Sequence, residues 1–421
     1  MTSFFRSLAL ICATAAMMLL VFLWMGAAYG TRMLVEGACL AIIALGLTIQ
    51  WGYAGLFNAG IVGFVATAAF VSMVVSVPGN ERFNELAGAG ALALPLLILF
   101  FGLALTVVAA NLRWSRLSLR FRSTPAFALG IGTVLAVQIA LRPTIATLEQ
   151  EHEWIGGLGL PLWVAWPGAA LAAAGLGWAI GRVTLGLRAD YLAIATLGIS
   201  EIVVAFLKNA DWLTHGTITV SPLPWPVPAP QDLGFVLSRG LYLSIAAVTI
   251  VVIFFMLERA RASPWGRMMR AIRDNEASAA AMGKDVNRRR LEIFVLGNAI
   301  VGLGGAMLIT STSIFDPTSF SPLNHTFLIW IMVILGGAGN NLGTVLGAFL
   351  VYAIWTVSEP ASLFVFQAAA DWAQASLGWT PPSDLHTRAL QMRVFLIGLA
   401  IVVVLRVAPG GLLPERPVRY E

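Results

Sequence analysis

The fold is decided by long apolar stretches, of which residues 8–28, LALICATAAMMLLVFLWMGAA, are the first. About 20 consecutive apolar residues are enough for an α-helix to cross the hydrocarbon core of a bilayer. Similar stretches recur along the chain, which predicts a polytopic membrane protein. The candidate spans lie near residues 8–28, 33–50, 53–77, 91–110, 125–141, 162–181, 190–207, 240–257, 291–310, 326–338, 342–358 and 390–407.

The composition points to the same class of protein. Hydrophobic residues make up 58% of the 421 residues and charged residues only 11%, with a mean hydropathy of +0.84. A soluble domain carries about 25% charged residues, so an ordinary soluble enzyme is excluded. The apolar stretches are continuous rather than alternating, which excludes a transmembrane β-barrel. We expect an all-α transmembrane helix bundle of about 10–12 spans, forming a single domain over residues 1–421.

Two of the stretches have a second interpretation. Residues 8–28 could belong to a signal peptide, because Arg6 precedes them. We prefer a first membrane helix, since the stretch is long for a signal peptide and more apolar stretches follow at once. The short pair 326–338 and 342–358 is compatible with two tilted helices or with a re-entrant element.

The distribution of arginine and lysine predicts the orientation. Cytoplasmic loops of membrane proteins carry an excess of these residues. With the N-terminus inside, most of the 26 basic residues fall on the inner side, including clusters at 113–122 and 259–290. We therefore expect a multi-pass protein of the bacterial inner membrane with both termini in the cytoplasm. The net charge of +5 then reflects orientation and contact with lipid, and it does not indicate binding of nucleic acid.

Several kinds of chemistry are missing from the sequence. A phosphate-binding loop of the type G-x-x-x-x-G-K-[ST] needs a lysine, and neither of the two lysines, Lys208 and Lys284, lies in that motif. The four histidines share no helical spacing and form no metal-ligand pair with a cysteine. We expect no metal, no bound cofactor and no catalytic residue in this chain. Any ATP must be used by a partner chain.

The largest predicted inner loop, residues 258–290, contains an amphipathic segment. Ser263 is a suitable N-cap, Pro264 suits the first turn and Gly283 can end the helix, which predicts a helix over 264–282. The helical period separates two faces. The segment could lie on the membrane surface, but we favour its insertion into a groove of a soluble partner. The apolar face holds Trp265, Met268, Ile272, Ala279 and Met282, and the charged face holds Arg267, Arg270, Arg273, Asp274 and Lys284.

The same region resembles the cytoplasmic loop and following helix of branched-chain amino-acid ABC transporter permeases, over GRMMRAIRDNEASAAAMGKDV and the residues after it. Glu276, Ala277 and Gly283 are similar to the coupling signature of that family. Other matches are RADYLAIATLGISE from Arg188, LGGAGNNLGTVLGA from Leu335, ALGLTIQWGYAGLFNAG from Ala44 and LRVAPGGLLPE from Leu405. The sequence departs from the pattern in an added helical hairpin near 111–160 and a longer outer loop at 359–388.

The resemblance implies a permease subunit of a binding-protein-dependent importer, and not an enzyme. In such an importer a periplasmic solute-binding protein delivers the substrate, a second permease subunit completes the pathway, and two cytoplasmic ATPase subunits hydrolyse ATP. The substrate would be a branched-chain or related amino acid. The residues that couple the chain to the ATPase would be Arg267, Arg270, Arg273, Asp274, Glu276, Ala277 and Gly283.

Other functions are left open by the sequence. A secondary, ion-coupled carrier needs no ATPase, but it usually places acidic residues deep in the membrane. An integral membrane enzyme needs polar residues that converge on one site, and no such cluster stands out. An ABC permease for urea or short-chain amides is the nearest alternative within the resemblance.

Polar residues inside the predicted spans are the candidates for a translocation pathway: Asn58, Thr196, Glu201 and Asn298. Glu201 lies about 16 Å along the helix axis from the start of its span, close to the middle of the membrane. Each of the four could equally be a structural residue that bonds to a neighbouring helix.

Two further features concern packing and loops. Gly339, Gly343 and Gly347 form overlapping G-x-x-x-G spacings, which allow helices to approach closely in lipid. The outer loop 208–239 contains alternating prolines from Pro222 to Pro230, which favour extended backbone. That loop is either a docking surface for an outside partner or a lid that connects two spans.

Overall fold

Helices are the regular elements of the described part of the chain. The computed structural model describes residues 2–79, 93–111, 124–151, 156–378, 382 and 384–415. Within these residues the only β-type pairs are isolated bridges between Gly79 and Gly156 and between Val220 and Phe315. The basic cluster predicted at 113–122 lies outside the described residues.

Contacts divide the chain into two compact units, where the sequence predicted a single domain. The first unit comprises Met1–Ser76, Leu160–Leu207 and Thr219–Glu421, and the second comprises Val77–Gly159 and Lys208–Ile218. In the second unit α5 (Ala93–Asn111) packs against α6 (Thr124–Glu151), and α9 (Asp211–Thr214) contacts α6.

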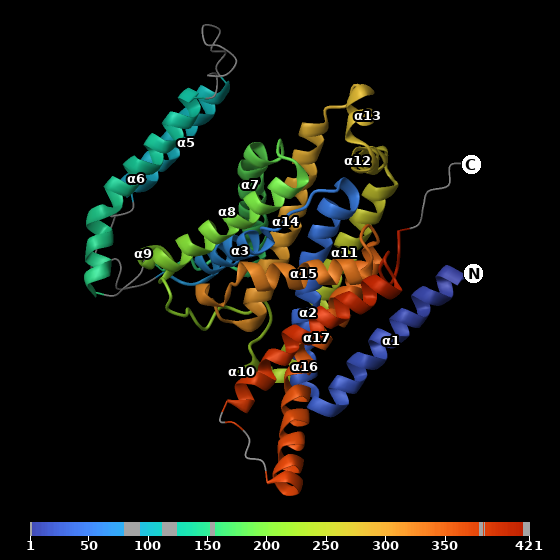
Figure 1. The fold of residues 1–421 in the computed structure, drawn as a ribbon. Coiled ribbons are helices and arrows are strands. Elements are labelled where there is room, and N and C mark those ends of the chain that lie inside the picture. The colour runs from blue at the N-terminus through green and yellow to red at the C-terminus, as the bar shows by residue number, and fades with distance from the viewer. Residues whose placement is uncertain are drawn as a thin grey trace. The chain divides into compact units, whose positions relative to one another are not determined.

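The first unit contains most of the helices of the described residues (Figure 1). They are α1 (Thr2–Met25), α2 (Ala27–Thr48) with its π-helical extension η1 (Ile49–Tyr53), α3 (Ile61–Ser76), α7 (Leu162–Thr184), α8 (Ala189–Asn209), α10 (Pro230–Leu233), α11 (Phe235–Ala262), α12 (Pro264–Asp274), α13 (Glu276–Ala281), α14 (Val286–Thr312), the 3₁₀ turn η3 (Pro317–Ser319), α15 (Pro322–Gly336), α16 (Asn341–Leu377) and α17 (Leu385–Val407).

Each predicted span overlaps a helix. Among the described residues, eight helices are long and apolar enough to cross a membrane, and two shorter apolar helices lie at Ile61–Ser76 and His325–Gly336. The prediction of an all-α, multi-pass membrane protein is therefore confirmed.

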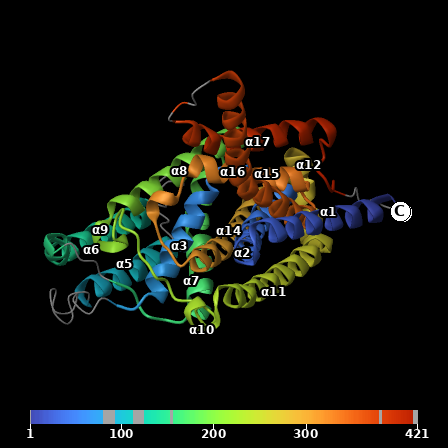
Figure 2. The ribbon, with the colours of Figure 1, turned by 90° about the horizontal axis from the view of Figure 1, so that it is seen from below.

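Helix α2 forms the centre of the first unit. Its membrane window is 94% buried inside the chain, compared with 11% for the window in α1. Helices α1, α11, α14 and α16 all contact α2, and Figure 2 shows them around it. A Cβ atom at Gly46 of α2 would lie 2.7 Å from the carbonyl oxygen of Gly297 in α14. Small residues at this crossing let the two backbones touch, as is common in membrane proteins.

Three predicted boundaries are wrong. The predicted span 53–77 is interrupted, because η1 ends at Tyr53, residues 55–60 form a non-helical segment inside the bundle, and α3 begins only at Ile61. Helix α16 continues past Pro360 to Leu377, so most of the predicted outer loop 359–388 is helix. The sequence after Pro360 is rich in alanine and other helix formers, and Gly378 ends the helix with a φ of 64°. Helix α11 begins at Phe235, so the loop predicted to reach residue 239 is shorter.

Candidate functional site

Three buried amide side chains meet at the break between α2 and α3. The Nε2 atom of Gln50 donates to Oδ1 of Asn298 at 3.1 Å, and Nδ2 of Asn58 donates to Oε1 of Gln50 at 2.9 Å and to Oδ1 of Asn298 at 3.2 Å. All three side chains are fully shielded from solvent within the chain. We call Gln50, Asn58 and Asn298 the amide cluster.

Hydrogen bonds to the backbone of the non-helical segment 55–60 hold Asn58 in place. The Oδ1 atom of Asn58 accepts from the amide of Gly60 at 2.9 Å, and the indole of Trp330 donates to the Asn58 carbonyl at 3.0 Å. Thr196 of α8 accepts from the amide of Ala59 at 3.1 Å. Backbone groups that leave a helix inside a membrane must find partners within the protein. These bonds supply such partners, so the fold stabilises the break between η1 and α3.

The structure brings together three of the four predicted pathway residues. Asn58 and Asn298 bond directly, and Thr196 bonds to the residue next to Asn58. Glu201 does not join them, because it lies on an exposed face of α8 within this chain. The Nδ2 atom of Asn298 is buried without a hydrogen-bond partner, so the cluster keeps a free donor. Neutral amides can bind polar groups of a solute by hydrogen bonds, without proton transfer.

A second polar network lies where η1 approaches the turn between α15 and α16. The hydroxyl of Tyr53 donates to Oδ1 of Asn341 at 3.0 Å, and Nδ2 of Asn341 donates to Oε1 of Glu258 at 2.9 Å. The hydroxyls of Thr48 and Thr344 lie 2.7 Å apart. The network links α2 and η1 to α11 and α16.

The predicted packing glycines lie at this turn and at the start of α16. Gly339 has a φ of 84°, and a Cβ atom at Gly52 would lie 2.5 Å from its backbone nitrogen. Cβ atoms at Gly343 and Gly347 would each lie 2.3 Å from a carbonyl oxygen of α15. Glycine is therefore required for the close approach of these backbones.

The predicted helix over 264–282 is two helices. Ser263 caps α12 as expected, accepting from the amide of Gly266 at 3.3 Å. Asn275 then adopts an extended conformation, with a φ of −156°, and its side chain accepts from the amide of Ser278 at 2.9 Å. The helix breaks there because Asn275 serves as the N-cap of α13. Gly283 follows α13 with a φ of 74°, which suits glycine.

The two faces of this α12–α13 segment are partly as predicted. Ile272 and Ala279 are buried, and Trp265 and Met268 are half-buried. Met269, which was not predicted, is fully buried as well. Met282 is 80% exposed and does not share the buried face of Ile272 and Ala279 within the chain. The break at Asn275 changes the direction of the second helix, so the single helical period that placed these residues on one face does not continue through the segment.

The predicted coupling residues divide into two groups by exposure. One group is exposed: Arg267, Asp274, Ala277 and Gly283, together with Glu276, which pairs with Arg290 at 2.7 Å. The other group, Arg270 and Arg273, is half-buried against the rest of the chain. Arg270 donates to the carbonyl of Arg261 at 3.2 Å. Arg273 donates to the carbonyl of Gly52 and to Oε2 of Glu415, at 2.8 Å for the latter.

Arg273 therefore joins α12 to η1 and to the C-terminal segment. Burial lowers the pKa of Arg273, but the hydrogen bonds and charges of Glu415 and Asp274 together outweigh burial, and the pKa lies above its ordinary value. The guanidinium stays charged. We call the contacts of Arg273, Gly52, Gly339, Asn341 and Glu415 the α12 junction.

Sequence reasoning missed several of these residues. Gln50, Glu258 and Asn341 bond inside the chain, and Gln50 and Asn341 lie in stretches that carry the family resemblance, yet none of the three was predicted as a site residue. Glu36, an acid within a predicted span, was also missed; it is 9% exposed. A polar residue inside an apolar stretch was the available signal in the cases of Glu36 and Gln50.

The family comparison matches most of the chain. Residues 117–405 match the family described as branched-chain amino acid transport system / permease component. The chain is 26% identical over 409 residues to the probable branched-chain amino acid transport permease protein LivM of Methanocaldococcus jannaschii, covering 95% of this chain and 94% of that protein.

Other relatives match shorter parts of the chain. It is 30% identical over 212 residues to the high-affinity branched-chain amino acid transport system permease protein LivM of Escherichia coli, covering 46% of this chain and 50% of that protein. A ribose import permease protein of Haemophilus influenzae is 22% identical over 229 residues, covering 53% of this chain and 66% of that protein. No solved structure matches the chain significantly.

Proposed function

Because the chain belongs to the permease-component family of branched-chain amino acid transport systems, we propose that it is the permease subunit of an ABC importer for branched-chain or related amino acids. It works in the bacterial inner membrane with both termini in the cytoplasm. Its partners are a second permease subunit, two cytoplasmic ATPase subunits that use the ATP, and a periplasmic solute-binding protein.

The observation that carries the proposal is the contact of α12 with η1. The exposed side of the α12–α13 segment offers Arg267, Asp274 and Glu276 to an ATPase. On its inner side, Arg273 holds the carbonyl of Gly52. Gln50, two residues before Gly52, belongs to the amide cluster. A displacement of α12 by the ATPase would therefore act directly on the helix break that positions Gln50 and Asn58.

The substrate class is supported by the relatives. The relatives that match 95% and 46% of the chain are named as branched-chain amino acid permeases. The ribose permease matches at lower identity. The amide cluster suits a solute with polar groups, and it contains no titratable side chain of the kind that a proton-coupled carrier uses. These points favour an amino-acid importer over a secondary carrier, and over a permease for urea or short-chain amides.

Reconstitution tests the proposal. The chain is co-expressed with its candidate partners, purified in lipid nanodiscs and assayed for ATP hydrolysis, with and without a binding protein loaded with leucine, isoleucine or valine. We expect hydrolysis to rise with the loaded binding protein, and proteoliposomes to accumulate labelled leucine. Accumulation by the chain alone, driven by an ion gradient, would establish a secondary carrier instead.

A further inference from the structure

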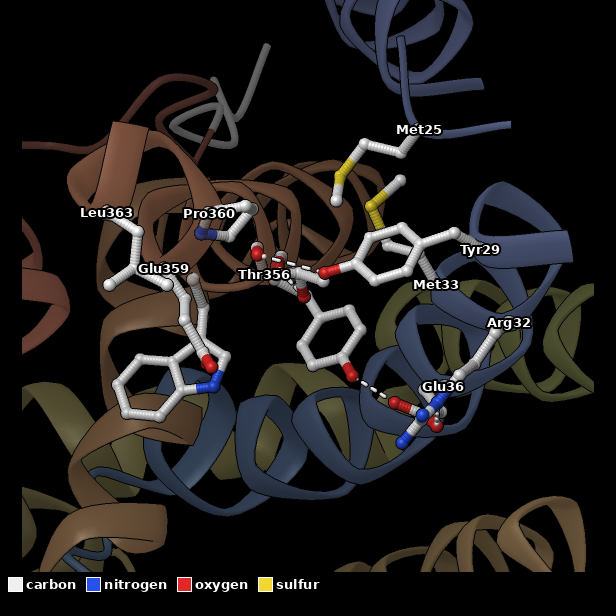
Figure 3. A pocket seen from close by; sticks show the side chains of 11 residues that line it. Met25, Tyr29, Arg32, Met33, Glu36, Thr356, Glu359, Pro360 and Leu363 are labelled. Atoms are coloured by element: carbon white, nitrogen blue, oxygen red, sulfur yellow. Dashed lines mark hydrogen bonds and ion pairs between the residues drawn. The ribbon is translucent and has the colours of Figure 1, made fainter. Parts of the chain in front are cut away.

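A cavity of about 410 Å³ lies between α1, α2 and α16, lined by charged and aromatic side chains (Figure 3). Its size is at the lower end of the range for small-molecule sites. Arg32 and Glu36 lie on one side of the cavity and Glu359 on the other, as Figure 3 shows. Apolar side chains, including Met25, Met33 and Leu363, complete the lining. We call this cavity the charged pocket.

Arg32 presents a largely exposed guanidinium group on one side of the charged pocket. The Nε atom of Arg32 donates to Oε1 of Glu36 at 2.7 Å, while 56% of the Arg32 side chain is exposed. The second oxygen of Glu36 accepts from the hydroxyl of Tyr352. Arg239 of α11 is 9% exposed, interacts electrostatically with both Arg32 and Glu36, and has an Nη1 atom without a hydrogen-bond partner. Arg239 does not line the charged pocket, but its charge adds to that of Arg32 in the surroundings of Glu36.

On the opposite side of the charged pocket, the Glu359 carboxylate forms a weak and exposed ion pair. Its Oε2 atom lies 3.3 Å from Nη1 of Arg393, and both side chains are close to half exposed. Such an exposed pair contributes little to stability, so the carboxylate is available to another cation. Arg393 also lies over the ring of Trp355, which lines the charged pocket.

The lengths of α2 and α16 place the charged pocket near one membrane surface. Arg32 is close to the start of α2, whereas Glu359 is 18 residues beyond Asn341, the first residue of α16. At 1.5 Å per residue those 18 residues span about 27 Å, close to the thickness of the hydrocarbon core. In the proposed orientation the charged pocket lies at the outer surface, where a solute arrives.

We propose that the charged pocket binds a small zwitterion, with its anionic oxygen group on Arg32 and its ammonium group on Glu359. Arginine pairs well with carboxylate or phosphate oxygens because its donors form a fixed fork. The methionines and Leu363 accommodate an apolar remainder. A free amino acid and the headgroup of phosphatidylethanolamine both have this chemistry. The inference goes beyond the proposed function, because binding is measurable in the chain without an ATPase.

The test uses the purified full chain in nanodiscs of phosphatidylglycerol, with labelled leucine as the probe. Leucinol, which lacks the carboxylate, and 4-methylpentanoate, which lacks the ammonium group, serve as competitors. We expect Arg32→Gln and Glu359→Gln each to weaken leucine binding about tenfold, the effect of losing a hydrogen bond to a charged group. Each competitor should likewise bind about tenfold more weakly than leucine.

Matched controls remove the same groups outside the charged pocket. Arg388 and Asp384 form an exposed pair at 2.8 Å, and Arg388→Gln and Asp384→Asn should leave leucine binding unchanged. Thermal unfolding of each variant separates a loss of binding from a loss of fold. If a pocket variant does not fold, the competitor experiment on the unmodified chain still tests whether both charged groups of leucine are recognised.

A second arm identifies the source of the zwitterion. The chain is purified from membranes that contain phosphatidylethanolamine, and bound lipid is counted by native mass spectrometry. Retention of phosphatidylethanolamine that is lost in both pocket variants but kept in both controls would make the headgroup the ligand. The proposal is overturned if neither leucine nor this lipid distinguishes the pocket variants from the controls. Uptake by the reconstituted importer in that case would leave the proposed function standing.

Discussion

Helices α2 and α16 contact each other at two places that differ in how they are held. At the α12 junction, Gly52 and Gly339 bring backbones together, and Tyr53 bonds to Asn341. At the charged pocket, the contacts are made by side chains around a cavity of about 410 Å³. Backbone packing without space resists displacement, whereas side chains around a cavity can rearrange. We therefore expect relative movement of the two helices to be easier at the charged pocket than at the α12 junction.

Because of this difference, a force applied at the α12 junction would be passed along α2 and α16 to the charged pocket. The α12–α13 segment reaches the α12 junction through Arg273, and the charged pocket lies on the same two helices about 27 Å away along α16 at 1.5 Å per residue. A partner that moves α12 would move the fixed ends of both helices together. Substitutions at the α12 junction and at the charged pocket should then differ in their cost to folding.

Gly52→Val should have the largest effect on folding. A Cβ atom at this position would lie 2.5 Å from the backbone nitrogen of Gly339, and a backbone cannot move aside as a flexible side chain can. Overpacking of this kind should lower the unfolding free energy by about 3 kcal/mol. Denaturant titration of the purified protein in detergent measures the change.

Gly198→Val is the matched control, because a Cβ atom at Gly198 of α8 meets nothing within 4 Å. We expect it to change the unfolding free energy only slightly. Equal destabilisation by the two substitutions would show that the α12 junction is not packed more tightly than an exposed helix face.

Arg273→Gln should have the next largest effect. The substitution removes the bonds to the Gly52 carbonyl and to Glu415, and a bond to a charged group contributes about 2 kcal/mol. The same titration measures the loss of stability, and reconstitution measures the loss of coupling between ATP hydrolysis and uptake. Arg288→Gln is the control, since the Arg288 side chain is 73% exposed and pairs with Glu292 on its own helix. Full coupling in Arg273→Gln would exclude this contact from the route between α12 and η1.

Tyr352→Phe tests the charged pocket and should cost less than Arg273→Gln, about 1.5 kcal/mol, because it removes a single hydrogen bond to a carboxylate. The substitution removes the hydroxyl that bonds to Glu36 and keeps the ring. Tyr191→Phe, on an exposed face of α8, is the control and should change nothing. A loss as large as that of Gly52→Val would mean that the charged pocket is as rigid as the α12 junction.

The sequence predicted the helices well because a membrane span depends on the summed hydropathy of about 20 consecutive residues, and not on any single residue. Each predicted span overlaps a helix, and the predicted cap at Ser263 forms. The predicted helix boundaries were wrong where a single residue determines whether the helix ends. Asn275 breaks the predicted helix over 264–282 because its side chain caps α13, while Pro360 does not end α16 because the residues after it favour helix.

The candidate sites were predictable only as single residues. Asn58, Thr196 and Asn298 stood out because polar residues are costly inside a membrane. The contacts among these three residues depend on the non-helical segment 55–60, which local sequence patterns do not specify. The long-range partners Gln50, Glu36 and Tyr352 were missed for the same reason, since each bond joins segments that only the folded bundle brings together.

The smallest effect on folding should come from reversing the charges of Glu276 and Arg290, which pair outside the α12 junction. Glu276 is 49% exposed, so Glu276→Arg should cost less than about 1 kcal/mol of stability. If Glu276 contacts the ATPase, this single variant should nevertheless lower ATP-driven uptake. The double variant Glu276→Arg with Arg290→Glu restores an ion pair within the chain but presents the wrong charge to a partner. Uptake that stays low in the double variant therefore assigns Glu276 to the partner contact, whereas recovery of uptake assigns it to the intramolecular pair alone.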